Sequence, residues 1–171
     1  MNSKYKTISF TIAVVFFFSS ITYTATAQTF NSADALKEYL NRQPANSPDK
    51  PISVTMTANA PMLEGIAAVI NSAGKYVNLN LSGNVLTTIP DNAFKKCIPL
   101  ATITIPDSVT SIGDNAFEGC TGLNSVTLQS IIASDNLLSD SFPGDLRDKY
   151  LAGGIGTYKR PNGSSETWTK R

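Results

Sequence analysis

Apolar and polar residues alternate in the middle of the chain, which is the pattern of strands with one buried face. The alternating stretches are residues 77–81, 102–105 and 125–128. In the second stretch, Ile103 and Ile105 alternate with two threonines. The pattern therefore predicts three short strands whose apolar side chains enter one core and whose polar side chains lie on the opposite face.

The same region contains an internal repeat with a period of 23 residues. Between Thr87 and Ile105, nine residues are identical to the residue 23 positions later: Thr87, Ile89, Asp91, Asn92, Ala93, Phe94, Cys97, Leu100 and Thr104. Leu79 and Leu81 match Ile103 and Ile105 at a spacing of 24 instead, which places one extra residue in the turn around Gly83. A repeat of this length is typical of stacked coils.

Each repeat predicts a strand, a turn and an inward-facing cluster of side chains. We expect Asp114 to cap a short helical turn by accepting backbone N–H bonds, which brings Ala116, Phe117 and Cys120 to its inner side. The predicted repeat core consists of Ile89, Phe94, Cys97, Ile103, Ile105, Ile112, Phe117, Cys120, Val126 and Leu128. Cys97 and Cys120 would lie within disulfide range in adjacent coils, but parallel stacking favours buried free thiols.

Two segments of the repeat carry a family resemblance. Residues 89–97, Ile-Pro-Asp-Asn-Ala-Phe-Lys-Lys-Cys, and residues 105–120 resemble the BspA-type leucine-rich repeat, a bacterial solenoid class. The tail, in residues 144–151 and 156–169, resembles the closing segment of small exported spirochaete proteins of this type. The resemblance implies a surface or secreted protein that binds other macromolecules.

A stack of two full repeats and a partial one needs caps, because each coil buries only its neighbours. We therefore predict an α/β solenoid, a short leucine-rich-repeat stack between an N-terminal α/β cap and a C-terminal hairpin cap. The predicted divisions are a signal peptide (1–27), the N-terminal cap (28–75), the repeats (76–130) and the C-terminal cap (131–171).

The caps have their own patterns. Apolar residues recur at helical spacing in residues 33–42, after Ser32, and again from Pro61 until Gly74, with an alternating stretch, residues 52–57, between these two helices. Downstream, we expect a short helix that begins at Asp145 and then two strands, residues 157–160 and 166–170. Tyr158 and Trp168 in these strands are expected to pack on the core rather than to anchor a partner.

The first residues have the pattern of an export signal. Lys4 and Lys6 precede an apolar run over residues 8–18, and small polar residues follow up to Ala27. As a helix, this run is roughly 17 Å long, which is too short to cross a hydrocarbon core of about 30 Å. We expect cleavage after Ala27, no stable membrane insertion afterwards, and a mature protein that is periplasmic, on the outer surface or secreted.

Composition narrows the possible functions. The chain has no His, which removes the usual general base and the commonest metal ligand, so we expect no catalytic residue, no metal and no cofactor. Its 14 Lys plus Arg and 13 Asp plus Glu are mixed along the sequence, and this distribution argues against a nucleic-acid partner. These observations predict a protein that binds without catalysing a reaction.

The outward positions of the predicted strands form the candidate binding surface: Tyr76, Asn78, Asn80, Thr102, Thr104, Ser125 and Thr127. Solenoids use such concave sheets for recognition, so we expect a protein or glycan partner at the surface of a host or neighbouring cell. One alternative is a small carbohydrate hydrolase that uses a carboxylate pair, Asp145 with Asp148 or Asp34 with Glu38. Another is a structural or antigenic surface protein without a dedicated ligand.

Overall fold

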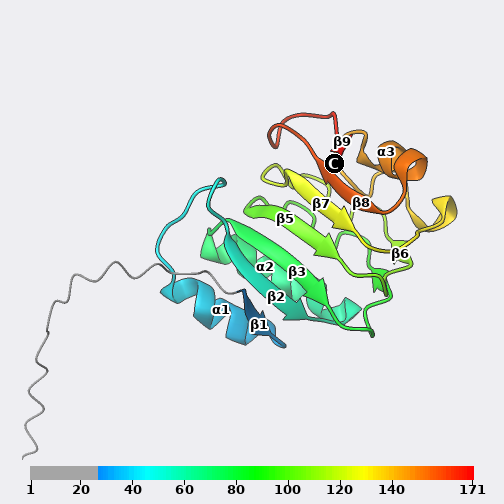
Figure 1. The fold of residues 1–171 in the computed structure, drawn as a ribbon. Coiled ribbons are helices and arrows are strands. Elements are labelled where there is room, and N and C mark those ends of the chain that lie inside the picture. The colour runs from blue at the N-terminus through cyan, green and yellow to red at the C-terminus, as the bar shows by residue number, and fades with distance from the viewer. Residues whose placement is uncertain (1–26) are drawn as a thin grey trace, which may run out of the picture.

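The computed structural model describes residues 27–171, which form a mixed α/β fold built on a largely parallel sheet (Figure 1). The sheet has seven strands, in the spatial order β1 (Gln28–Phe30), β2 (Ile52–Thr57), β3 (Val77–Ser82), β5 (Leu100–Ile105), β7 (Ser125–Leu128), β8 (Gly156–Lys159) and β9 (Thr169–Lys170). A second, two-stranded sheet pairs β4 (Thr88–Ile89) with β6 (Ser111–Ile112). The predicted signal peptide lies outside the described residues, apart from Ala27.

Three α-helices and two 3-10 turns complete the fold. They are α1 (Ala33–Arg42), η1 (Ala60–Met62), α2 (Leu63–Ala73), η2 (Ser134–Asn136) and α3 (Leu146–Gly153). Figure 1 shows α1 and α2 beside the β1–β3 end of the sheet and α3 beside the other end. In residues 27–171, no helix has both the length and the apolar character needed to cross a membrane.

Helix α1 begins and α2 ends where the sequence predicts, whereas Pro61, the predicted start of the second helix, lies in η1 and α2 begins at Leu63. The Ser32 hydroxyl accepts a 3.2 Å hydrogen bond from the Ala35 N–H at the start of α1. Leu36 and Leu40 are fully buried on the inner side of this helix. After α2, Gly74 has a φ of 58°, a left-handed conformation that ends a helix at little cost for glycine. Strand β1, which pairs in parallel with β2, was not predicted from the sequence.

Strand pairing follows the period of the sequence. Thr102 pairs with Ser125 at a separation of 23 residues, whereas Leu79 pairs with Ile103 at a separation of 24. The change arises in β5, because Val77 pairs with Leu100 and the next residue, Asn78, pairs with Thr102. Ala101 is therefore the extra residue of a bulge, which the sequence analysis did not anticipate. Beyond the turn around Gly83 the separation returns to 23, at the pairing of β4 with β6.

The turns that follow β4 and β6 stack as a column. Phe94, Phe117 and Phe142 lie parallel to one another, with ring centroids separated by 5.2 Å and 4.8 Å. The Phe117 N–H also donates a 2.9 Å hydrogen bond to the Ser141 carbonyl. The third aromatic layer thus comes from residues 141 and 142, which the sequence analysis placed in the C-terminal cap.

The predicted helical turn after Asp114 is wrong. The segment is a non-helical turn in which Asn115 has a left-handed φ of 54°, as its repeat equivalent Asn92 does at 59°. The Asp114 N–H donates a 2.8 Å hydrogen bond to the Asp91 carboxylate of the preceding coil. Asparagine tolerates the left-handed region, so the turn bonds to the neighbouring coils instead of closing a helical turn on itself.

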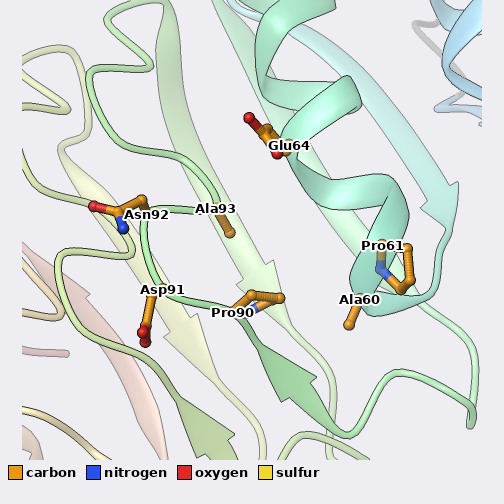
Figure 2. Close-up of a pocket in the computed structure, with 7 residues that line it drawn as sticks. All are labelled: Ala60, Pro61, Glu64, Pro90, Asp91, Asn92 and Ala93. Carbon is orange, nitrogen blue, oxygen red and sulfur yellow. The ribbon is translucent and has the colours of Figure 1, made fainter.

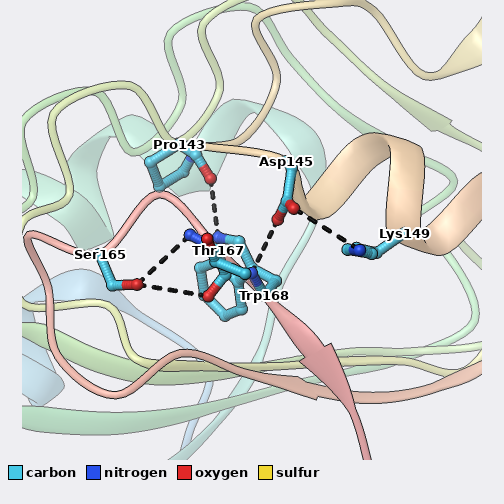
Figure 3. A network of polar contacts seen from close by, with 6 residues as sticks. All are labelled: Pro143, Asp145, Lys149, Ser165, Thr167 and Trp168. Atoms are coloured by element: carbon cyan, nitrogen blue, oxygen red, sulfur yellow. Dashed lines mark hydrogen bonds and ion pairs between the residues drawn. The ribbon is translucent and has the colours of Figure 1, made fainter.

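The C-terminal segment covers the last parallel strand. β8 pairs antiparallel with β7, and β9 pairs antiparallel with β8. The predicted strand over residues 166–170 is shorter in the structure, because the Glu166 carbonyl accepts the Asp145 N–H instead of continuing the sheet. The Trp168 backbone N–H likewise donates to the Asp145 carboxylate (Figure 3). Tyr158 and Trp168 are fully buried, so both aromatic side chains pack on the core.

Arg160 joins this segment to the last coil. Its guanidinium is almost fully buried and donates to the carbonyls of Cys120, Leu123 and Ser165, at 3.0, 2.6 and 2.9 Å. The group also lies 5.0 Å from the centroid of the Trp168 ring, a cation–π distance. Burial lowers the pKa of Arg160 from its usual value, while the Glu166 carboxylate opposes this change.

Candidate functional site

One face of the sheet carries two straight rows of polar side chains, which we call the polar rows. Strand pairing places the members of each row on neighbouring strands, about 4.8 Å apart. The first row is Ser53, Asn78, Thr102, Ser125 and Lys159. The second row is Thr55, Asn80, Thr104, Thr127 and Thr157. All ten side chains are half-buried or exposed.

Side chains in the polar rows bond to one another at both ends of the sheet. Asn78 donates to the Ser53 hydroxyl at 3.3 Å and accepts a bond from the Thr102 hydroxyl. At the far end, the Thr127 and Thr157 hydroxyls lie 2.9 Å apart. These contacts fix side-chain directions across several strands, which lowers the entropy that a ligand would have to remove.

The middle of the polar rows is free of such bonds. Among residues 27–171, the hydroxyls of Thr104 and Ser125 have no hydrogen-bond partner within the protein, although both strands lie inside the sheet. Each hydroxyl offers one donor and two acceptor positions. The rows contain one charged side chain, Lys159, at the β8 end. The centre is therefore a neutral surface that both donates and accepts hydrogen bonds.

Tyr76 lies immediately before β3, and two hydrogen bonds to the Asn46 side chain hold its backbone in place. Its N–H donates to the Asn46 side-chain oxygen at 2.9 Å, and its carbonyl accepts from the Asn46 amide at 2.7 Å. The side chain is half-buried. Strand alternation places it on the face of Asn78 and Asn80, so all seven residues predicted for binding lie along this face.

The row members from the two caps were not predicted from the sequence. Ser53 and Thr55 come from β2, and Thr157 and Lys159 come from β8. A signal for the first pair was present, since residues 53–55 and residues 125–127 are both Ser-Val-Thr. Nothing local identifies the β8 pair, because its position depends on antiparallel pairing with β7.

The opposite face of the sheet is the core. All ten residues predicted for the repeat core are buried, none above 1% exposed: Ile89, Phe94, Cys97, Ile103, Ile105, Ile112, Phe117, Cys120, Val126 and Leu128. The two cysteines are free thiols. Burial raises the pKa of Cys97 well above its usual range and that of Cys120 to about 12, so neither provides a thiolate nucleophile at neutral pH.

Three of the four carboxylates considered for hydrolysis have structural contacts: Asp145, Asp148 and Glu38. Asp145 accepts the Trp168 N–H at 2.7 Å and lies 3.8 Å from the Lys149 ammonium group (Figure 3). Asp148 lies 3.6 Å from the Arg147 guanidinium, and Glu38 pairs with Arg42 on the exposed side of α1. Within the described residues, no three His, Cys, Asp or Glu side chains form a group able to hold a metal ion.

The comparisons with known proteins identify the repeat. Residues 74–142 match the family model of the BspA type Leucine rich repeat region (6 copies), a segment that runs from just before β3 to the third aromatic layer at Phe142. Comparison with the curated proteins and with the solved structures gave no match. Residues 74–142 are thus similar to the BspA-type leucine-rich repeats, a family that suggests a module for protein–protein interaction.

Proposed function

We propose that this protein is an exported, non-enzymatic binding module that recognises a protein or glycan at a cell surface through the polar rows. The observation that carries the proposal is the centre of the rows, where the hydroxyls of Thr104 in β5 and Ser125 in β7, at diagonal positions on neighbouring strands, have no protein partners in the described residues. The backbone at these two positions is held by strand pairing on both sides, and groups on a fixed backbone bind with a smaller entropy cost than groups on a flexible one.

The proposed architecture is a short leucine-rich-repeat solenoid with an α/β cap and a hairpin cap. Supporting it are the family match, the 23-residue pairing of β5 with β7 and the stacked phenylalanines. In such a stack, neighbouring coils present equivalent outward side chains in line, and the resulting sheet is the usual recognition surface. The polar rows have this arrangement.

Export rests on the N-terminal sequence and on the tail. The apolar run over residues 8–18 and the small residues that end at Ala27 fit a cleaved signal, and the tail resembles that of small exported spirochaete proteins of this type. Absence of catalysis is part of the proposal as well. It is supported by the raised thiol pKa values and by the structural contacts of Asp145.

The test is to block the centre of the rows. A Thr104→Arg/Ser125→Arg variant places two bulky cations where neutral hydroxyls lie, and Ala68→Arg, at an exposed position of α2, is the matched control. Binding of the purified mature chain is measured on intact cells and on arrays of surface proteins and glycans. The variant should lose at least about tenfold in affinity, and the control should not.

Two results would contradict the proposal. Equal binding by the wild type and the double variant would show that the ligand lies elsewhere. If the wild type bound no cell, protein or glycan above the background level of the double variant, the result would favour a structural or antigenic surface protein without a dedicated ligand. Mass spectrometry of the mature N-terminus tests the predicted cleavage after Ala27.

A further inference from the structure

A pocket of about 370 Å³ lies on the side of the molecule away from the polar rows, where the N-terminal cap meets the first repeat turn (Figure 2). One wall is formed by Ala60, Pro61 and Glu64 from η1 and α2, and the other by residues 90–93 of the turn after β4. The pocket occupies the position that a further coil would fill if the turn column continued toward the N-terminus.

The geometry of the turn column shows which groups face the pocket. Three N–H groups of the first turn donate to the second turn: Asn92 to the Asp114 carbonyl at 2.9 Å, Phe94 to Ala116 at 2.8 Å and Lys96 to Glu118 at 2.6 Å. In a planar trans peptide, the carbonyl points opposite to the N–H of the next residue. The carbonyls of Asp91, Ala93 and Lys95 therefore point away from the second turn, and of these three residues Asp91 and Ala93 line the pocket.

These three carbonyls form an unpaired edge. Their equivalents 23 residues later are the carbonyls of Asp114, Ala116 and Glu118, and each of these accepts a hydrogen bond from an N–H group of the first turn. Within residues 27–171, no backbone or side-chain donor reaches the carbonyls of Asp91, Ala93 or Lys95. Because Asn92 and Lys96 are left-handed and the N–H groups of residues 92–96 are already bonded, this side of the turn presents acceptors only and favours a ligand that brings N–H donors.

The other groups of the pocket also favour a ligand that donates hydrogen bonds. Pro61 and Pro90 contribute no backbone N–H to its walls. The Asp91 carboxylate is engaged by the Asp114 N–H at 2.8 Å, and Figure 2 shows the Asp91 and Asn92 side chains pointing away from η1 and α2. Glu64 is exposed in the first turn of α2, on the wall opposite the free carbonyls. It provides the free negative charge of the pocket.

We propose that this pocket binds a peptide segment that carries Lys or Arg. N–H groups of the segment donate to the free carbonyls of Asp91 and Ala93, which line the pocket. Its cationic side chain lies against the Glu64 carboxylate, which gives the site a charge preference that the neutral edge alone lacks. The site is separate from the polar rows and does not depend on their function.

The test is an NMR titration of the ¹⁵N-labelled mature chain with the peptide acetyl-Thr-Lys-Thr-Lys-Thr-amide. Alternating residues favour an extended backbone and place both lysines on one side. We expect saturable shifts of the amides of residues 60–64 and 91–96, with an affinity of about 1 mM or better. The amides of residues 102–104 and 125–127, in the polar rows, should not shift.

Three controls separate the elements of the proposal. Glu64→Gln keeps the size of the side chain and should weaken binding by about threefold to fivefold, as expected for loss of an exposed ion pair. A peptide with Glu in place of both lysines should bind more weakly still. A peptide with N-methyl groups at alternate residues, on the edge that faces the turn, should not bind.

Several outcomes would overturn the inference. These are absence of shifts at saturating peptide, shifts confined to the polar rows, equal binding of the N-methylated or the Glu peptide, and an unchanged affinity for Glu64→Gln. Concentration-dependent broadening of the residue 91–96 amides without peptide would instead assign the edge to a second copy of the chain. The Thr104→Arg/Ser125→Arg variant should bind the lysine peptide like the wild type, so failure here and failure of the proposed function are distinguishable.

Discussion

The rings of Phe94 and Phe117 are stacked, with centroids 5.2 Å apart and planes inclined by 3°. The two residues are separated by 23 positions, and both side chains are fully buried. Their contact shows that successive coils are held in register by side chains as well as by backbone hydrogen bonds. The spacing equals about one strand separation, so the aromatic column and the sheet advance together.

Removal of one ring from this column should be costly. Phe117→Ala deletes a side chain that stacks on Phe94 and also on Phe142, at 4.8 Å, and leaves a cavity between two layers. We expect the free energy of unfolding to fall by about 3 to 5 kcal/mol in urea denaturation. The neighbouring Glu118→Ala removes an exposed ion pair with Lys95 and should change this free energy by less than about 1 kcal/mol. Equal stability of the two variants would contradict the role of the column.

The strands and the inward side chains could be predicted because they depend on local patterns. Alternation located β3, β5 and β7, and the 23-residue identity located the core positions of the second coil from those of the first. Helix α1 followed from Ser32 and from the spacing of Leu36 and Leu40. Each of these features is determined by residues within one turn or one strand.

What the sequence did not predict depends on neighbouring layers. The turn at Asp114 is non-helical because Asn115 is left-handed and because the N–H groups of Asp114 and Phe117 bond to the neighbouring layers, at Asp91 and Ser141. The strand around Trp168 is short because its backbone bonds to Asp145, which is distant in sequence. In the candidate site, Thr157 and Lys159 belong to the polar rows because β8 pairs antiparallel with β7. The sequence around these two residues does not indicate this pairing. The free carbonyls beside the pocket could not be predicted either, because they are recognised only from the fact that no further turn stacks on the first one.

Asp145 should be important for stability rather than for catalysis. Asp145→Ala removes the acceptor of the partly buried Trp168 backbone N–H and should lower the free energy of unfolding by about 1 to 3 kcal/mol. Asp148→Ala is the matched control, since its side chain is 80% exposed, and should shift stability by less than about 0.5 kcal/mol. Measurable turnover of a glycoside by the wild type that both variants abolish would instead support the carbohydrate hydrolase.

The two buried thiols predict a loss of stability at alkaline pH. Burial raises the pKa of Cys120 from 9.0 to about 12 and that of Cys97 further, so the folded chain keeps both protons where the unfolded chain releases them. Because the unfolded state then binds fewer protons, the free energy of unfolding falls as pH rises above about 9. The slope from each thiol is at most about 1.4 kcal/mol per pH unit.

Urea denaturation between about pH 8 and pH 10.5 measures this effect. The tyrosines also titrate in this range, so the comparison is with the Cys97→Ala/Cys120→Ala variant, which keeps them. The variant should be less stable at neutral pH because of the lost packing, but its stability should fall less steeply with pH. Parallel pH profiles for the two proteins would show that the thiols are not protected by folding.

Close packing between the turns should make Gly113 intolerant of a side chain. A Cβ atom at this position would lie 2.2 Å from the Asp91 carboxylate oxygen and 2.5 Å from the Asp91 backbone nitrogen. Gly113→Ala should therefore lower the melting temperature and cost about 1 to 3 kcal/mol. Gly65→Ala in α2, where the nearest atom is 3.9 Å away, should instead stabilise the helix by about 0.5 to 1 kcal/mol. A stabilising Gly113→Ala would mean that the two turns are further apart than described.

Arg160 should determine whether the C-terminal segment stays attached to the last coil. Arg160→Met keeps a long apolar side chain but leaves the carbonyls of Cys120, Leu123 and Ser165 without their donor. Unsatisfied buried carbonyls cost about 1 to 3 kcal/mol each, so we expect a loss of at least about 3 kcal/mol. Hydrogen exchange should show faster exchange in β8 and at Trp168 before it does in β2 and β3. Lys159→Met, at an exposed neighbouring position, is the control and should leave exchange unchanged. Uniform acceleration across the sheet would mean that the segment does not open separately from the repeats.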